Sequence, residues 1–275
     1  MTEFAILEEA KKEKRTVAIG LERVTDNIVK SIKKAGKYVD IITVGKAVNG
    51  IKNIEGDSHT LVQLLKDKKV DGIVRGNFDA VKMYEAFRDL FNVSFISQIQ
   101  LFLLNGVRSI DEEKKGLFTI VPVSFSNERT IEDKIRTINL SIELFRSLKI
   151  DPKLGILAKG KPEDRSEGIA EINKSLDEAD YLVDFYKKRG IWAKHFNHQI
   201  EYALLESNII VAPDSGAGNL AAHCLIYLGT CESLGGIAAN LKDYIYVQGS
   251  EAQQDFYNNI MLAAGIANST LKFNL

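Results

Sequence analysis

The chain has 275 residues, and its 36 lysines and arginines are almost balanced by 37 aspartates and glutamates, for a formal net charge of -1. This balance gives no electrostatic reason to expect a protein that binds nucleic acid or an anionic membrane surface. Hydrophobic residues make up 45 % and charged residues 27 %, which is ordinary for a soluble globular protein. Two cysteines cannot form a disulfide framework, the longest apolar stretch is interrupted by polar residues, and the acidic start is unlike a secretory signal. We therefore expect a reduced, cytoplasmic protein.

Short apolar runs alternate with amphipathic stretches along the whole chain. In chain order, the first half predicts a strand over 16–20, a helix over 27–35, a strand over 39–45, a helix starting at 58–60, a strand over 70–74, a helix over 80–91 and a strand over 117–123. The second half predicts a helix starting at 131, then a strand over 154–158, a helix over 176–188, a strand over 208–212, a helix over 219–228, a strand over 244–247 and a helix over 255–267. This rhythm indicates an α/β protein with parallel sheet, and because the strands are too many for most single sheets, we expect two lobes.

The helix that starts at 131 has the clearest pattern. Apolar residues recur at spacings of four, three, four and three, which marks one buried helical face. These residues are Ile131, Ile135, Ile138, Ile142 and Phe145. Thr130 is the expected N-cap of this helix.

The sharpest candidate site is the loop between the strand over 208–212 and the helix that follows it. Small residues let the backbone turn tightly and expose its N–H groups, and the helix adds a positive dipole end, so an anion such as phosphate fits there. The candidate ligands are Asp214, Ser215, Gly216, Ala217, Gly218 and Asn219. The alternative is a plain strand-to-helix turn in which Asp214 or Asn219 caps the helix.

Polar residues follow three other predicted strands, at the edge where ligands of α/β proteins bind. Arg75, Gly76 and Asn77 form one such group, and Arg75 is suited to clamp a phosphate. Ser126 and Lys159 take the same topological position after two later strands. The alternative for Arg75 is a surface arginine, which the sequence alone favours, and the loops of Ser126 and Lys159 are equally suited to be solvated.

The histidines and cysteines predict no metal site. His195 and His198 are three residues apart, a spacing that a metal uses on a helix, but no third ligand lies near them in the sequence. Neighbouring aromatic residues favour packing instead.

Several segments resemble a known family of enzymes. The run P-D-S-G-A-G-N over 213–219 resembles the P-D-x-x-A-G-N loop of phosphate acetyl/butyryl transferases. The run over 70–76 is similar to the A-D-G-x-V-x-G segment of the same family, and 151–157 is similar to its P-K-x-A-x-L strand. Over the whole chain, the sequence more closely resembles the methanogen-marker group called MtxX, which is described as methyltransferase-related.

The resemblance implies a fold and an assembly. The family has two α/β lobes, like isocitrate and isopropylmalate dehydrogenases, with the ligand held between them. Transferred to this chain, residues 1–146 and 253–275 make a discontinuous first lobe, and residues 147–252 make the second. The acyltransferases are usually homodimers.

The catalytic segment of the family is only partly retained. Acyltransferases carry a late D-x-S-R-G-x-S-x-E-D segment, whose final Asp is the base toward the coenzyme A thiol; Asp255 falls on that position. Gln248 and Gly249 stand where the family has Ser and Arg. Loss of one preorganised donor costs on the order of 100- to 1,000-fold in rate, although Gln248 still offers a neutral hydrogen bond. The alternative role for Asp255 is to stabilise a helix N-terminus.

Two functions therefore follow from the resemblance. The first is a transferase that binds a small phosphorylated or acyl-phosphate anion, with coenzyme A as a candidate substrate and no other cofactor assigned. The second is a non-catalytic accessory protein that partners a methyltransferase. Function resides in sites rather than in folds, so the resemblance by itself does not decide between them.

Overall fold

The computed structural model describes residues 5–94, 96–107, 112–123, 130–229, 231–241 and 243–269. The chain forms two compact units, one made of Met1–Ser97 with Leu234–Leu275 and the other of Gln98–Ser233. Within the described residues, no helix is long and apolar enough to span a membrane. The first unit is discontinuous in sequence, because the chain leaves it at Ser97 and returns at Leu234.

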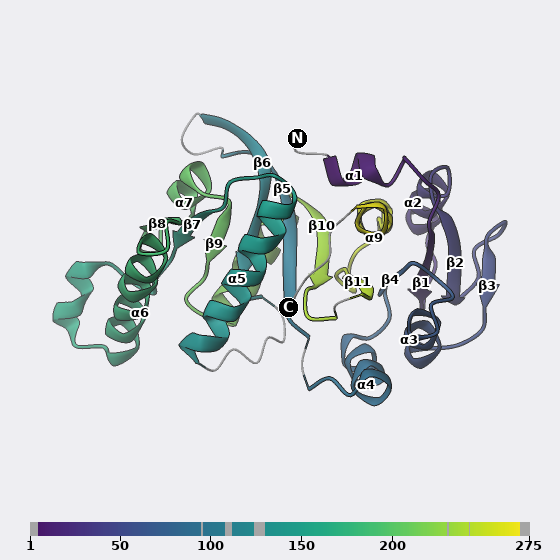
Figure 1. The fold of residues 1–275 in the computed structure, drawn as a ribbon, viewed down its shortest axis with the longest axis horizontal. Coiled ribbons are helices and arrows are strands. Elements are labelled where there is room, and N and C mark those ends of the chain that lie inside the picture. Colours follow the sequence, from purple (N-terminus) through teal and green to yellow (C-terminus); the bar gives the residue numbers. More distant parts are fainter. Residues whose placement is uncertain are drawn as a thin grey trace. The chain divides into compact units, whose positions relative to one another are not determined.

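Parallel strands make up most of the sheet in the first unit (Figure 1). Their order is β3-β2-β1-β4-β11, and each neighbouring pair is parallel. The bounds are β1 Thr16–Leu21, β2 Asp40–Gly45, β3 Lys52–Ile54, β4 Gly72–Val74 and β11 Ile245–Gln248. Strand β10, Cys231–Ala238, pairs with β11 in the antiparallel direction through Gly236 and Ile237. Because β1, β2 and β4 run the same way, their polar loops leave from one edge of the sheet.

Helices cover both faces of the sheet in the first unit, with α2 and α9 on one face and α3 and α4 on the other (Figure 1). The bounds are α1 Ala5–Glu9, α2 Asp26–Ala35, α3 Ser58–Lys66, α4 Ala80–Phe91 and α9 Tyr257–Asn268. On the second face, Leu61, Leu65 and Phe87 pack with Ile73 of β4 in one buried cluster. Burial on both faces explains why the strands are almost continuously apolar.

The second unit combines a hairpin with a parallel arrangement. Strand β5 (Gln98–Val107) pairs antiparallel with β6 (Glu112–Val121), and the parallel order then runs β6-β9-β7-β8. The other bounds are β7 Lys153–Ile156, β8 Trp192–His195 and β9 Ile209–Val211. The helical bounds are α5 Ile131–Ser147, η1 Pro162–Glu167, α6 Ala170–Lys187, α7 Ile200–Glu206 and α8 Ser215–Tyr227. Helices α7 and α8 pack on one buried cluster, whereas α5 and α6 lie in front of the strands in Figure 1.

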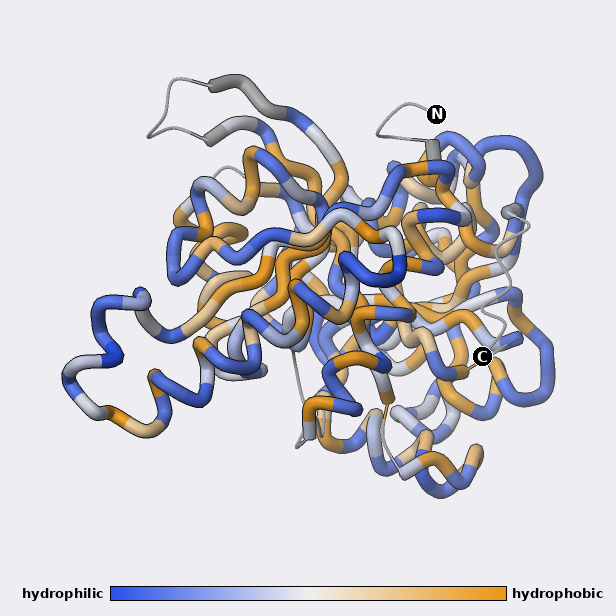
Figure 2. The backbone as a smooth tube through the Cα atoms, turned by 60° about the vertical axis from the view of Figure 1, so that its left-hand side comes forward, coloured by the Kyte–Doolittle hydropathy of each residue, from blue (hydrophilic) through white to orange (hydrophobic). Residues whose placement is uncertain are grey.

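Hydropathy follows this layering in each unit. Figure 2 shows hydrophobic segments mostly in the interior and hydrophilic segments at many of the outer turns. In α5, the expected stripe is confirmed at Ile138, Ile142 and Phe145, which are buried, whereas Ile131 and Ile135 are half-buried. The expected N-cap is also confirmed, because the Thr130 side chain accepts a hydrogen bond from the backbone of Asp133.

The α/β class with mostly parallel strands is confirmed, but several strands were missed. Four were not predicted: β3, β5, β8 and β10. Strand β3 reads Lys-Asn-Ile and β8 reads Trp-Ala-Lys-His, so neither has the apolar run that marked the equally short β4 and β9. Strand β5 is apolar on both faces and pairs antiparallel with β6, the next strand in the chain. In the part of the chain that the structure describes, β6 is also the next element after β5, so β5 falls outside the strand–helix alternation that the prediction followed.

The divisions between lobes were expected at 146/147 and 252/253, whereas the compact units divide at 97/98 and 233/234. Helix α5 explains part of this difference, because it packs against β5, β6 and β9 of the second unit. A chain-order pattern cannot show on which sheet such a helix packs.

The glycine after β4 provides a test of this fold. Gly76 has a φ of 62°, and a Cβ there would lie 1.9 Å from the carbonyl oxygen of Gly20. We expect Gly76→Ala to lower the free energy of unfolding by roughly 2–5 kcal/mol, because backbone strain adds to overpacking. Urea unfolding measures this loss.

Gly50→Ala is the matched control, because Gly50 also has a positive φ, of 82°, but a Cβ there meets nothing within 4 Å. This variant carries only the left-handed backbone cost of about 1–2 kcal/mol. Equal losses in the two variants would show that the approach of Gly76 to Gly20 does not matter.

Candidate functional site

The N-terminus of α8 is the first candidate site, and it belongs to the second unit. Strand β9 ends at Val211, and α8 begins at Ser215. Asp214 caps the helix: its backbone is extended, and its Oδ1 accepts a hydrogen bond from the Ala217 amide at 2.9 Å. The cap interpretation of Asp214 is therefore confirmed.

Lys159 meets Asp214 at this helix end. Its Nζ lies 3.1 Å from Asp214 Oδ2 and 3.6 Å from Glu171 Oε1. Lys159 follows β7 and Asp214 follows β9, and these two strands are parallel neighbours. The sheet therefore brings the two residues together at the carboxyl ends of the strands. The hydrogen bond from the Ala217 amide lowers the pKa of Asp214, with a further contribution from Lys159. In return, Asp214 raises the pKa of Lys159.

A second lysine, Lys134 of α5, was missed by the sequence analysis. Its side chain is only 10 % exposed, and its Nζ donates to the Pro213 carbonyl at 2.8 Å and to Glu178 Oε2 at 3.1 Å. The signal was present in the sequence, because Lys134 follows Ile131 by three positions and precedes Ile138 by four, within the apolar face. A lysine on a buried helical face needs polar partners, and here it holds the backbone that leads into α8.

The small residues of the loop have different environments. Gly218 is buried, and a Cβ there would lie 2.0 Å from the Pro122 carbonyl oxygen, so this glycine permits the close packing of α8. Gly216 is exposed, whereas Ser215, Ala217 and Asn219 are half-buried. The exposed first turn at Gly216 is therefore the part of the loop that solvent reaches.

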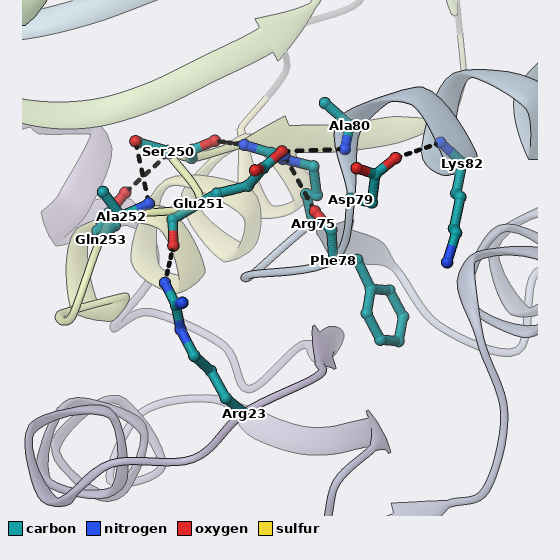
Figure 3. Close-up of polar contacts among 11 residues, drawn as sticks. Arg23, Arg75, Phe78, Asp79, Ala80, Lys82, Ser250, Glu251, Ala252 and Gln253 are labelled. Atoms are coloured by element: carbon teal, nitrogen blue, oxygen red, sulfur yellow. Dashed lines mark hydrogen bonds and ion pairs between the residues drawn. The ribbon is translucent and has the colours of Figure 1, made fainter.

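Arg75 and its neighbours belong to the first unit. Arg75 is 3 % exposed, and its guanidinium points at the segment that follows β11 (Figure 3). Its Nη1 donates to the Phe78 carbonyl and to Glu251 Oε1, both at 3.0 Å, and its Nη2 donates to the Gly249 carbonyl. The guanidinium that was predicted to clamp a phosphate thus holds a carboxylate of its own chain.

Asn77 holds the loop after β1. Asn77 is 5 % exposed, and its Oδ1 accepts from the Glu22 amide at 2.7 Å and from the Arg23 amide at 3.4 Å. Its Nδ2 donates to the Arg23 carbonyl at 2.8 Å. These bonds assign Asn77 a positioning role between the ends of β1 and β4, and its predicted contact with a ligand stays a prediction.

Asp255 and Gln248 flank the segment that Arg75 holds. Asp255 is exposed, and its Oδ1 accepts from the Tyr257 amide at 2.8 Å, in the first turn of α9. Gln248 is the last residue of β11 and pairs with Gly236 of β10. The helix-end role of Asp255 is confirmed, and the catalytic roles of both residues stay predictions.

Two other sequence predictions concern residues away from these groups. Ser126 lies outside the described residues. His195 is at the end of strand β8 rather than on a helix, and its Nδ1 lies 2.9 Å from Asp180 Oδ1. Within the part of the chain that the structure describes, no group of His, Cys, Asp and Glu side chains could hold a metal ion.

Comparison with known proteins gives relatives in sequence and in structure. No protein-family model matches the chain. The chain is 28 % identical over 269 residues to methyltransferase mtx subunit X of Methanosarcina barkeri, covering 94 % of this chain and 96 % of the relative. The protein of the same name from Methanosarcina mazei is 28 % identical over 279 residues, covering 96 % of each chain. The predicted resemblance to this group is confirmed.

Two solved structures resemble the fold over nearly their whole length. A branched-chain phosphotransacylase from Enterococcus faecalis has a TM-score of 0.68 at 15 % identity, covering 93 % of this chain and 99 % of that chain. The EutD phosphotransacetylase from Staphylococcus aureus has a TM-score of 0.59 at 15 % identity, covering 95 % and 98 %. The fold is therefore similar to that of phosphotransacylases.

The capping carboxylate of α8 predicts a pH dependence. Because the pKa of Asp214 is lower in the folded chain than in the unfolded chain, its contribution to stability is present above about pH 4 and is lost as pH falls through the folded pKa. Asn keeps the cap but cannot titrate. We expect the stability advantage of the wild type over Asp214→Asn to shrink between about pH 5 and about pH 3 in urea unfolding.

The contribution of Lys159 can be measured separately. In Lys159→Met, the pKa of Asp214, followed by NMR of its carboxyl carbon, should rise toward the usual range because the ammonium partner is gone. A pH-independent difference between wild type and Asp214→Asn would contradict the assigned cap.

Proposed function

We propose that the first turn of α8 binds a phosphorylated anion, and that the chain is a phosphotransacylase-like transferase with altered chemistry. The observation that carries this proposal is the meeting of Lys159 with Asp214 at the start of a 13-residue helix. The phosphotransacylase-like fold and the P-D-x-x-A-G-N-like loop support it.

The arrangement explains how an anion would be held. The N–H groups of the first helical turn and the helix dipole both favour negative charge, and the turn is exposed at Gly216. Lys159 is 35 % exposed and is paired with two carboxylates, so its ammonium group can turn from Asp214 and Glu171 to an incoming phosphate. Lys134 keeps the Pro213 carbonyl fixed, which limits how far the loop can move when the anion enters.

The proposed reaction transfers an acyl group from an acyl phosphate to the thiol of coenzyme A. The thiol sulfur bonds to the acyl carbon, the bond from that carbon to the phosphate oxygen breaks, and phosphate leaves. The thiol proton passes to a base, and Asp255 is the residue proposed for this role. With Gln248 and Gly249 in place of Ser and Arg, the charge on the reacting oxygens is less well stabilised, so we propose slow or altered transfer.

The alternative proposal is an accessory protein for a methyltransferase. The similarity to methyltransferase mtx subunit X extends over 94 to 96 % of the chain, which favours a shared role as a subunit. Stable co-purification with a methyl-transfer protein is the expected outcome of this alternative. In that case, the anion would regulate the protein and would not be transferred.

A titration with inorganic phosphate tests the binding proposal. We expect phosphate to shift the Ala217 amide resonance of the wild type, and Lys159→Gln to weaken the affinity about tenfold, because a charge-assisted hydrogen bond is lost. As a control, Lys188→Gln removes the same charge from the exposed residue that follows α6, and it should leave the phosphate affinity unchanged. If phosphate does not shift the Ala217 amide, the proposed site is wrong.

An acyl-transfer assay separates the two functions. The transferase forms thioester from acetyl phosphate and coenzyme A, and Asp255→Asn abolishes it while an oxygen acceptor for the Tyr257 amide is retained. Phosphate binding without thioester formation favours the accessory protein.

We also infer a homodimer in the reducing cytoplasm. Helix α8 exposes Leu220 and Tyr227, and the residue after it, Leu228, is exposed as well, with 68, 48 and 81 % of their surfaces accessible. A second copy of the chain would cover these apolar side chains. Both Cys224 and Cys231 are free thiols, which suits a reducing compartment.

Light scattering tests the homodimer. The expected mass is about twice the 30.6 kDa of the chain. Leu228→Glu should give a monomer, because a charge placed in an apolar interface is unfavourable. A monomeric wild type would contradict the inference.

A further inference from the structure

The first unit contains a buried arginine whose carboxylate partner comes from an exposed loop. Arg75 is 3 % exposed, whereas the side chain of its partner Glu251 is 54 % exposed. A buried guanidinium needs a negative or polar partner, but a partner that is half in solvent can leave without breaking the core. The pair therefore has one fixed member and one that can move.

The carboxylate of Glu251 receives donors from two directions (Figure 3). Its Oε1 accepts from Arg75 Nη1 at 3.0 Å and from the Ala80 amide at 3.2 Å. Ala80 is the first residue of α4, a helix of 12 residues, so the carboxylate lies at the positive end of the helix dipole. The Nε of Arg75 is also buried and has no hydrogen-bond partner, so the guanidinium has donor capacity left.

We propose that Arg75 and the first turn of α4 form an oxyanion site, and that Glu251 is its internal ligand until a soluble anion displaces it. One oxygen accepts both donors, so any ligand with a carboxylate or phosphate oxygen can take this position. The site consists of first-unit residues alone, and it would stand even if α8 binds nothing. This proposal goes beyond the proposed function, because it adds a second anion site in which Glu251 competes with the soluble anion.

The exchange requires only the half-exposed side chain of Glu251 to turn, because hydrogen bonds hold the backbone of the segment around it. Arg23 donates to the Glu251 carbonyl, and Thr25 donates through its hydroxyl to Gln254 Oε1 at 2.9 Å. Both of these contacts are exposed. When the anion replaces the Glu251 carboxylate, the side chain turns to water, and Arg75 keeps its bonds to the Phe78 and Gly249 carbonyls.

The competition sets the size of the expected effect. If Glu251 occupies the site in about 90 to 99 % of molecules, the apparent affinity for a soluble anion is about 10- to 100-fold weaker than that of the open site. Removing the carboxylate of Glu251 should therefore strengthen anion binding by this factor. A purely structural ion pair would give no such gain.

The experiment follows the Ala80 amide by NMR while inorganic phosphate or acetate is added to the full-length chain at constant ionic strength. In Glu251→Ala, we expect saturable shifts of this amide at concentrations about 10- to 100-fold lower than in the wild type. Glu251→Gln keeps an oxygen acceptor and should be intermediate. Binding of phosphate alone identifies a phosphate ligand, and binding of acetate alone identifies a carboxylate ligand.

The controls separate the site from general charge effects and from α8. Glu85→Ala removes the same charge from an exposed position of α4 and should behave like the wild type. The Ala217 amide reports the α8 site independently, so each site succeeds or fails by its own resonance. The proposal is overturned if neither anion shifts the Ala80 amide in either folded Glu251 variant. It is also overturned if the wild type binds the anion as tightly as Glu251→Ala does, or if Glu85→Ala gains as much affinity as Glu251→Ala.

Discussion

Buried polar side chains hold the backbone of the loops beyond the strand ends, and both candidate sites depend on these hydrogen bonds. Asn77, after β4, holds the loop after β1 through three hydrogen bonds. Arg75 holds the Gly249 carbonyl beyond β11, and Lys134 holds the Pro213 carbonyl before α8. Parallel strands end at the same edge of the sheet, and the loops beyond them lie outside the backbone hydrogen bonds that pair the strands. Side-chain hydrogen bonds fix these loops instead. The polar groups at these edges are therefore partly structural.

Charge compensation within the chain limits what each site can do. Lys159 is paired with Asp214 and Glu171, and Arg75 is paired with Glu251. An anion that enters either site competes with a carboxylate already present, so binding depends on the difference between two similar interactions. Substitution of one of these carboxylates should therefore change the anion affinity of the site more than it would in a site whose cations have no carboxylate partner.

The similarity of fold does not transfer the activity. The chain resembles phosphotransacylases in structure at 15 % identity and methyltransferase mtx subunit X in sequence at 28 % identity. The segment after β11 differs from the acyltransferase pattern in chemistry, because Gln248 and Gly249 provide no cation. In this chain, Arg75 contacts the same segment from the loop after β4, but its guanidinium is bound to two carbonyls and to Glu251. The function therefore has to be established at the sites themselves.

The sequence by itself determined the α/β class, the cap at Thr130, the turn at Asp214 and the family resemblance, because these depend on local periods, capping residues and short motifs. It did not predict the β5–β6 hairpin, the short strands β3 and β8, or the division at 97/98 and 233/234. Only the tertiary structure decided that Lys159 pairs with Asp214, that Lys134 donates to the Pro213 carbonyl, and that Glu251 pairs with Arg75. These partners are distant in sequence, and no local pattern records which loops the sheet order and helix packing bring together.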